Sequence, residues 1–214
     1  MNRGNFSRTL PIILVVVIII VAIVAIISLG RAMFGGGDDA NEATTSQPAD
    51  DGRAALLATD TTRSVRFTQR GPIVADENFR SYQITVSTDN RTITAYEGYL
   101  QNALDSKTYA NNSRAYEEFV FALDKANMMN GDAFEGEADD TRGLCATGNV
   151  YEYEVLQGNR VVKRLWSTDC DGSKGSLEAS VEQLNNLFHN QVPDSDEVLE
   201  QAGMRQGGFG LFSL

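Results

Sequence analysis

Histidine is almost absent from this chain, because His189 is the only one among 214 residues. It follows Phe188 late in an amphipathic segment, where we expect a surface or partly packed side chain rather than a catalytic base. The sequence also contains no G-x-S-x-G, H-E-x-x-H, S-x-x-K or P-loop motif. We therefore expect no catalytic residues and no cofactor.

Charge is absent from residues 9–30, which lie between Arg8 and Arg31 and consist mostly of Ile and Val. A helix rises 1.5 Å per residue, so about 20 apolar residues cross a hydrocarbon core that is about 30 Å thick. We predict a transmembrane helix over residues 10–30, with the lipid bilayer as its partner. The alternatives are a cleaved signal peptide, whose apolar region is usually about 7–15 residues long, and a buried helix of a soluble domain.

The basic residues around this segment predict its orientation. Arg3 and Arg8 precede it and Arg31 follows it, and Lys and Arg are preferred on the cytoplasmic side. We expect a signal-anchored protein of the cell membrane with an extracytoplasmic domain. The expected layout is a cytoplasmic N-terminus (1–9), a transmembrane helix (10–30), a flexible linker (31–62), an α+β domain (63–192) and a C-terminal tail (193–214). The linker contains no aromatic residue after Phe34.

Basic residues are also scarce beyond the anchor. Three of the 18 basic and none of the 29 acidic residues lie before residue 32, so residues 32–214 carry a formal net charge of −14. This charge disfavours nucleic acid as a partner. The acidic stretches 132–140 and 169–173 offer oxygen ligands that could suit calcium, but neither has EF-hand spacing. We interpret them as a solvated loop and a turn, and we expect no metal site.

Cysteine occurs only at Cys145 and Cys170. Two cysteines without a nearby histidine make a poor metal site, whereas an extracytoplasmic pair is usually bridged. The segment between them resembles an antiparallel hairpin that turns at Gly158-Asn159. The expected cross-strand pairs are Leu156–Val161, Glu154–Lys163 and Tyr151–Trp166. The same register brings Cys170 opposite Thr147, two residues from Cys145, so we predict a Cys145–Cys170 disulfide.

The remaining patterns predict an α+β fold. A first strand includes residues 64–69, and residues 81–98 form a hairpin turning at Asp89-Asn90 that pairs Ile84 with Ala95. A helix N-capped by Ser113 carries the apolar stripe Tyr116, Phe119, Val120 and Leu123. A last helix over 176–190 carries Leu177, Val181, Leu184 and Phe188. The order β-β-β-α-β-β-α predicts an antiparallel sheet of about five strands, packed by two helices.

The C-terminal sequence "GGFGLFSL" places Phe209, Leu211, Phe212 and Leu214 beside the terminal carboxylate. Extended apolar tails can add as strands to the sheet edge of a partner. We therefore count these four residues among the candidate contacts for a protein or peptide. The alternative is a terminus that is frayed or folds back onto its own domain.

The order of strands and helices over residues 64–190, with Arg70-Gly71 ending the first strand, resembles the small emfourin-type inhibitors of metallopeptidases. The overall layout is similar to single-pass envelope proteins of bacteria. Arg70, Gly71 and Phe79, in and beside the loop from residue 71 to residue 80, are the other candidate contacts. We expect a non-catalytic domain that binds a protein, peptide or envelope component. The alternatives are a peptidase inhibitor, which the resemblance implies, and a hydrolase that uses carboxylates.

Overall fold

The computed structural model describes residues 51–204. The predicted transmembrane helix over 10–30 and the candidate contacts Phe209, Leu211, Phe212 and Leu214 lie outside the described residues. Within residues 51–204, each helix is too short or too polar to cross a bilayer.

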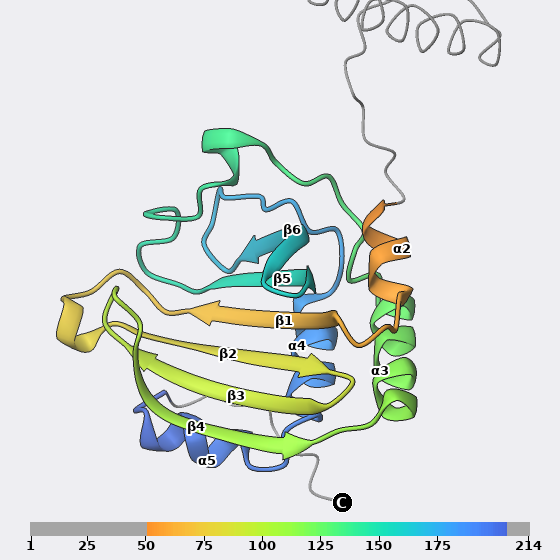
Figure 1. Cartoon of the computed structure of the whole chain (residues 1–214). Helices are drawn as coiled ribbons and strands as arrows, with labels where there is room; N and C mark the ends of the chain where they lie inside the picture. The colour runs from red at the N-terminus through yellow and green to blue at the C-terminus, as the bar shows by residue number, and fades with distance from the viewer. Residues whose placement is uncertain (1–50, 205–214) are drawn as a thin grey trace, which may run out of the picture. The chain divides into compact units, whose positions relative to one another are not determined.

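Residues 51–204 adopt an α+β fold with an antiparallel sheet of six strands (Figure 1). The strand order is β4-β3-β2-β1-β5-β6. The strands are β1 (Arg63–Arg70), β2 (Arg80–Ser87), β3 (Asn90–Glu97), β4 (Asn102–Ala110), β5 (Val150–Gln157) and β6 (Arg160–Thr168). The sheet thus has one strand more than expected. The additional strand is β4, an edge strand without a buried residue.

Within the described residues four helices accompany the sheet, where two were expected to pack it. They are α2 (Asp51–Leu57), α3 (Ser113–Lys125), α4 (Val181–His189) and α5 (Ser195–Gln201), with 3-10 turns at Asp76–Asn78 (η1) and Gly136–Asp139 (η2). Helix α2 lies in the range expected to be flexible linker, and the tail begins with the short helix α5. Leu56 of α2 and Val198 and Leu199 of α5 are buried in the core. Helices of seven residues are too short to be stable alone and depend on such packing.

The two predicted helices are present with corrected starts. The apolar stripe of α3 is buried as expected, but Asn112, not Ser113, caps the helix by accepting the N–H of Ala115. Helix α4 begins at Val181, later than predicted, because the Ser180 hydroxyl accepts the N–H of Gln183 and starts the helix there.

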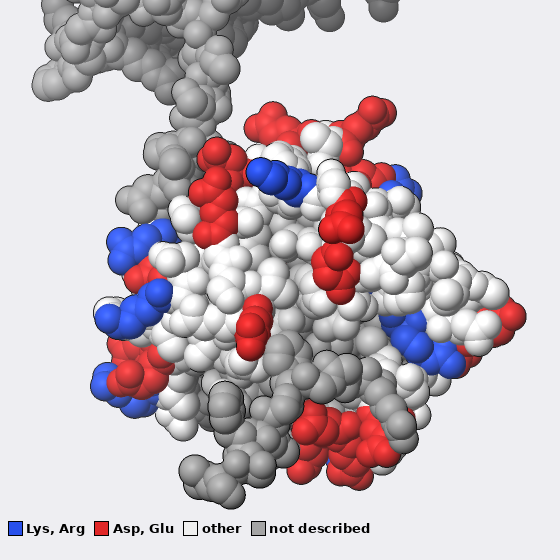
Figure 2. Space-filling view, turned by 180° about the vertical axis from the view of Figure 1, so that it is seen from behind, with Lys and Arg blue, Asp and Glu red and all other residues white. Residues whose placement is uncertain are grey.

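The core lies between the sheet and its helices, and α4 crosses behind the sheet in the view of Figure 1. Phe67 of β1 is at its centre and is fully buried. Its ring centroid lies 5.2 Å from that of Tyr153, 5.6 Å from that of Phe188 and 5.7 Å from that of Tyr82. Figure 2 shows the molecule from behind the view of Figure 1. Acidic side chains are spread over this face, in line with the negative net charge.

The predicted register of the β2–β3 hairpin was wrong by two residues. The structure pairs Ile84 with Ile93 rather than with Ala95. The Ser87 hydroxyl accepts the N–H of Asn90 at 3.1 Å, which fixes the turn one residue earlier than expected. A slip of two residues leaves every side chain on its expected face. Ile84, Ile93 and Ala95 are therefore still buried.

The β5–β6 hairpin follows its predicted register only near the turn. Leu156 pairs with Val161 as expected, but β6 then contains one extra residue, Val162. Beyond this bulge Trp166 pairs with Glu152, and the two remaining predicted pairs, Glu154–Lys163 and Tyr151–Trp166, were wrong. The bulge turns Trp166 to the sheet face opposite the helices, because one added residue exchanges the faces of a strand.

The predicted disulfide between Cys145 and Cys170 is confirmed, with the two Cα atoms 5.6 Å apart. It ties the segment before β5 to the segment after β6. Cys145 is buried. The disulfide therefore fixes the position of the loop that runs from η2 to β5.

Candidate functional site

The loop between β1 and β2, residues 71–79, separates two hollows of the surface. Its backbone is fixed at several points: Gly71 N–H donates to Arg80 O and Ile73 N–H donates to Ala146 O, each at 3.0 Å. The Tyr99 hydroxyl accepts the N–H of Val74 at 3.2 Å and donates to its carbonyl at 2.8 Å. The loop is thus bonded to β2, to the disulfide-linked segment and to the β3–β4 turn.

The smaller hollow, which we name the Arg70 pocket, has a volume of about 220 Å³. Its floor is a row of Ser81, Arg70 and Val150, which are cross-strand neighbours on β2, β1 and β5. The remaining lining residues come from the loop 71–79, the β3–β4 turn and the segment before β5: Gly71, Ile73, Phe79, Tyr99, Gln101, Thr141, Arg142, Gly143, Leu144 and Cys145. Three predicted contact residues, Arg70, Gly71 and Phe79, therefore meet at one pocket.

Aromatic packing forms one wall of the Arg70 pocket. The rings of Phe79 and Tyr99 are stacked, with centroids 4.1 Å apart. Phe79 is buried, whereas Tyr99 and Ile73 are about half exposed at the rim. The facing wall is the segment that the disulfide holds in place through Cys145. The pocket thus has apolar sides and a polar floor.

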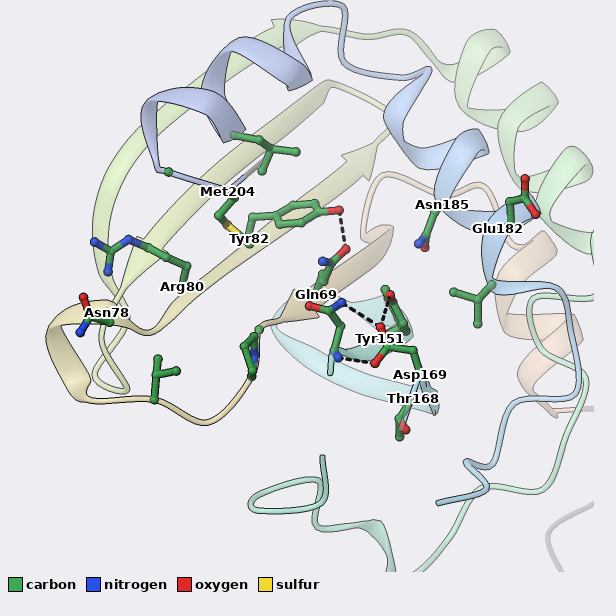
Figure 3. A pocket seen from close by; sticks show the side chains of 17 residues that line it. Gln69, Asn78, Arg80, Tyr82, Tyr151, Thr168, Asp169, Glu182, Asn185 and Met204 are labelled. Atoms are coloured by element: carbon green, nitrogen blue, oxygen red, sulfur yellow. Dashed lines mark hydrogen bonds between the residues drawn. The ribbon is translucent and has the colours of Figure 1, made fainter. Parts of the chain in front are cut away.

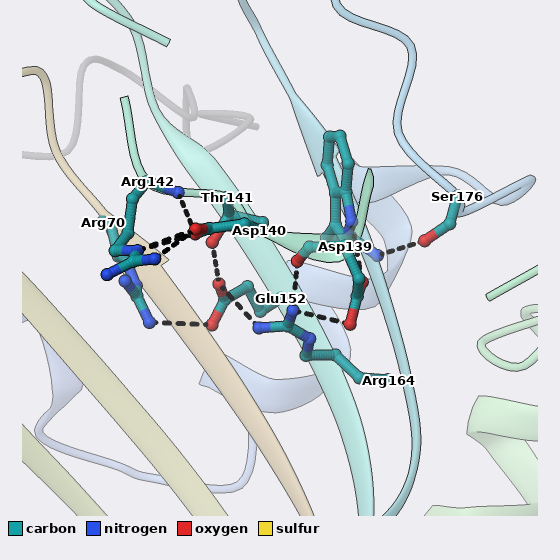
Figure 4. Close-up of polar contacts among 9 residues, drawn as sticks. Arg70, Asp139, Asp140, Thr141, Arg142, Glu152, Arg164 and Ser176 are labelled. Atoms are coloured by element: carbon teal, nitrogen blue, oxygen red, sulfur yellow. Dashed lines mark hydrogen bonds and ion pairs between the residues drawn. The ribbon is translucent and has the colours of Figure 1, made fainter. Parts of the chain in front are cut away.

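An ion network lies beside this floor (Figure 4). The carboxylate of Glu152, a residue only 3% exposed, accepts a hydrogen bond from the Thr141 hydroxyl at 2.7 Å. Its oxygens lie 3.3 Å from Arg70 Nη2 and 3.5 Å from Arg164 Nη1. Arg164 also pairs with Asp139, at 2.7 Å. The buried carboxylate is therefore shared between two arginines.

Arg142 completes the charged groups of the pocket. Its side chain is exposed and forms an ion pair with Asp140 through Nε and Nη2. The side-chain and backbone donors of Arg142 lower the pKa of the Asp140 carboxyl to about 2. Asp140 is therefore ionised throughout the neutral range, and the pair persists there.

The larger hollow, which we name the groove, lies on the helix side of the sheet and has a volume of about 720 Å³ (Figure 3). Its sheet side is formed by Gln69, Tyr82 and Tyr151, and its helix side includes Asn185 of α4 and Leu199 of α5. The Tyr82 hydroxyl donates to Gln69 Oε1 at 3.0 Å. The groove thus combines amide and hydroxyl groups with apolar helix residues, a composition typical of ligand sites.

Asp169 is the centre of hydrogen bonds at one end of the groove. Its Oδ2 accepts from Asn149 Nδ2 at 2.8 Å and from the Tyr151 hydroxyl at 3.1 Å. Burial and the adjacent Asp169 charge raise the pKa of Tyr151 to about 12. Tyr151 is therefore a neutral hydrogen-bond donor near pH 7.

His189 lies behind Tyr82. Its Nε2 is 2.9 Å from the Tyr82 hydroxyl oxygen, and burial lowers its pKa. The imidazole is thus neutral near pH 7 and is partly buried. His189 is not among the described residues that line the groove.

Potential metal ligands converge at one place within residues 51–204, where atoms of Cys145, Asp169 and Cys170 lie within 4.8 Å of one another. The two sulfurs are joined in the disulfide and offer no thiolate. The acidic residues of the stretch 132–140 do not form such a group.

Sequence reasoning missed several residues of both hollows. Ser81 and Arg142 reach the Arg70 pocket from segments far apart in the chain, and the groove residues Gln69 and Asn185 carry no local motif. The one available signal was the predicted disulfide, since it brings the segment around Cys145 to the end of the sheet.

No protein-family model matches this chain, and no curated protein matches it in sequence. The site must therefore be interpreted from its own chemistry, and the resemblance to emfourin-type inhibitors stays a prediction.

Proposed function

We propose that this chain is a single-pass membrane protein whose disulfide-bonded domain lies outside the cytoplasm and binds a protein, peptide or envelope component without catalysing a reaction. The observation that carries the proposal is the Cys145–Cys170 disulfide. Disulfides persist in oxidising compartments and are rare in the cytosol. A disulfide-bonded domain that follows 22 uncharged residues therefore supports an anchored extracytoplasmic location.

The two hollows support a binding role. Both are bordered by a loop whose backbone is bonded to three other segments, so the sites exist before a ligand arrives. Preformed sites bind more tightly because less conformational freedom is lost on association. The groove offers neutral donors and acceptors, and the Arg70 pocket offers arginines beside apolar walls.

The location is tested by expressing the full chain in bacterial cells. We expect it in the membrane fraction, with the domain cleaved by protease added to spheroplasts. A thiol-reactive polyethylene glycol should modify the denatured protein only after reduction. A matched control variant lacks residues 10–30. Recovery of the intact chain in the cytosol, with both thiols reactive, would contradict the proposal.

One observation favours the peptidase-inhibitor alternative: Ile73 and Val74 are exposed on a loop with a fixed backbone. Loops that inhibit peptidases are similarly held before binding. Inhibition of metallopeptidases by the purified chain, lost on Ile73→Asp, would establish this second candidate. An absence of inhibition at micromolar protein would remove it.

One observation favours the hydrolase alternative: Asp169 and Glu182 both line the groove. Glycoside hydrolases use two carboxylates that flank the scissile bond. A hydrolytic activity that falls at least about 100-fold in both Asp169→Asn and Glu182→Gln would establish a catalytic pair. Unchanged activity in either variant would exclude it.

A further inference from the structure

We propose that the Arg70 pocket binds a carboxylate attached to a small apolar body, as found at the C-terminal residue of a polypeptide or in a free N-acylated amino acid. This inference rests on the proposed binding function and deepens it by naming the chemistry of the ligand. It does not depend on the membrane anchor.

The charge of the lining is the first argument. The chain carries a formal net charge of −11. The described residues that line the Arg70 pocket nevertheless include two arginines, Arg70 and Arg142, and no Asp or Glu. Guanidinium groups bind carboxylates through paired, charge-assisted hydrogen bonds. The pocket is therefore a local exception to an acidic protein and favours an anion.

Hydrogen-bonding groups without a partner are the second argument. Ser81 is only 2% exposed, and its hydroxyl has no hydrogen-bond partner among the described residues. Arg70 Nε is likewise buried without a partner in this part of the chain. Buried polar groups are normally hydrogen-bonded. A carboxylate has two acceptor oxygens, so it would accept from both groups once their side chains turn toward it.

The existing ion pairs leave donors for such a ligand. Arg70 approaches Glu152 through Nη2, and Arg142 approaches Asp140 through Nε and Nη2. A guanidinium has five N–H groups. Binding of an anion therefore does not require either existing ion pair to break.

The walls and volume define the rest of the ligand. Phe79, Tyr99 and Leu144 give the pocket apolar sides above the floor that holds Ser81 and Arg70. Its volume of about 220 Å³ is below the range of about 300–1,000 Å³ that is typical of sites for drug-sized ligands. The pocket therefore suits one side chain of leucine size with its carboxylate, rather than an extended lipid or a large cofactor.

The test measures binding to the full chain in detergent micelles by isothermal titration calorimetry. The probes are N-acetyl-leucine, acetyl-Ala-Ala-Leu and the C-terminal amide of each. We expect each carboxylate to bind at least ten-fold more tightly than its amide. A peptide that binds at least ten-fold more tightly than N-acetyl-leucine identifies a polypeptide terminus as the ligand, whereas equal affinities identify a free small acid.

Variants then assign the binding to the Arg70 pocket. Arg142→Gln should weaken binding of the better carboxylate about ten-fold or more. Its matched control is Arg114→Gln on α3, since both arginines are exposed and paired with nearby acids, at 83% and 76% side-chain exposure. Arg70→Lys keeps the charge beside Glu152 but removes Nε, and should weaken binding without unfolding the domain.

Equal affinity for acid and amide, absence of binding by all probes, or equal losses in Arg142→Gln and Arg114→Gln would each overturn the assignment. These outcomes are distinct from a failure of the proposed function. Fractionation tests the anchor independently, and capture of partners from native membranes by the wild-type chain and by Arg142→Gln tests binding through any other surface.

Discussion

Arg70 and Glu152 form a diagonal ion pair between β1 and β5, with Arg70 Nη2 3.3 Å from Glu152 Oε2. In the ladder Arg70 faces Val150, two residues from Glu152, a separation that long side chains can bridge. Arg164 of β6 approaches the same carboxylate at 3.5 Å. One buried acid thus links three neighbouring strands beside the Arg70 pocket.

Replacement of Glu152 should therefore destabilise the domain. Glu152→Gln leaves two arginines without their shared carboxylate, and loss of one partner of a buried pair costs about 3–5 kcal/mol. The arginine side chains are 32% and 24% exposed and keep some solvent, so we expect about 1–3 kcal/mol. Urea unfolding followed by Trp166 fluorescence measures this loss. Glu117→Gln, at an exposed pair on α3, is the control and should change stability by less than about 0.5 kcal/mol.

Loss of the disulfide should cost about 3.5 kcal/mol, because Cys145 and Cys170 are 25 residues apart and close a loop of corresponding length in the unfolded chain. The Cys145→Ser, Cys170→Ser double variant should show this decrease in the free energy of unfolding. Reducing agent should destabilise the wild type and leave the double variant unaffected. Equal responses of the two proteins to the reductant would contradict the prediction.

The stability of the domain should fall as the pH is lowered below about 6.5. Burial lowers the pKa of His189 below its usual value of 6.5, with a smaller opposing effect from Asp196. The unfolded chain therefore binds a proton at this residue more readily than the folded chain. The contribution of the buried, neutral His189 to the free energy of unfolding is fully present above pH 6.5. It is lost as the pH falls toward the folded-state pKa of His189, and the free energy of unfolding changes by at most about 1.4 kcal/mol per pH unit.

The pH effect is measured as the free energy of unfolding between pH 7.5 and pH 5. His189→Gln should flatten the slope in this window. The same slope in the variant and the wild type would assign the effect to other groups.

Helix α2 should contribute to stability although it lies in the range expected to be linker. Leu56 is 1% exposed in the core, and Leu→Ala substitutions at such positions cost about 2–5 kcal/mol. Leu56→Ala should therefore lower the urea midpoint clearly. Leu100→Ala removes the same atoms at a site that is 87% exposed, and should change stability by less than about 0.5 kcal/mol. Similar effects of the two substitutions would show that α2 does not pack as described.

The parts of the fold that the sequence predicted are those with a repeated apolar face. The stripe Tyr116, Phe119, Val120 and Leu123 predicted α3, and the alternation in β1, β2 and β3 predicted half-buried strands. Strand β4 has no such face. Its contacts with β3 include two hydroxyl pairs, Thr92 with Thr108 at 3.0 Å and Thr94 with Ser106 at 2.9 Å. Because these contacts are polar, they produce no alternation of apolar residues in the sequence of β4.

The candidate site was predictable only in part. Arg70, Gly71 and Phe79 were selected from the end of a strand and the loop after it, and the structure brings them to one pocket. Arg142 follows Arg70 by 72 positions, and its approach depends on the Cys145–Cys170 disulfide and on the hydrogen bond between Ile73 N–H and Ala146 O. Each of these is a tertiary feature, so a local pattern does not reveal their combined effect.

Val162 shows how much depends on the bulge in β6. If Val162 were paired in regular register instead of bulged, the pairing begun by Leu156 and Val161 would continue unbroken, and Trp166 would face Tyr151 on the helix side of the sheet. Leu165 would exchange with it and point away from the core. The indole N–H that donates to Asp139 at 3.2 Å would then be lost to that carboxylate. The bulge thus decides which side chains of β6 face the helices, and deletion of Val162 would leave every later pair in place, because Lys163 would then follow Val161 directly.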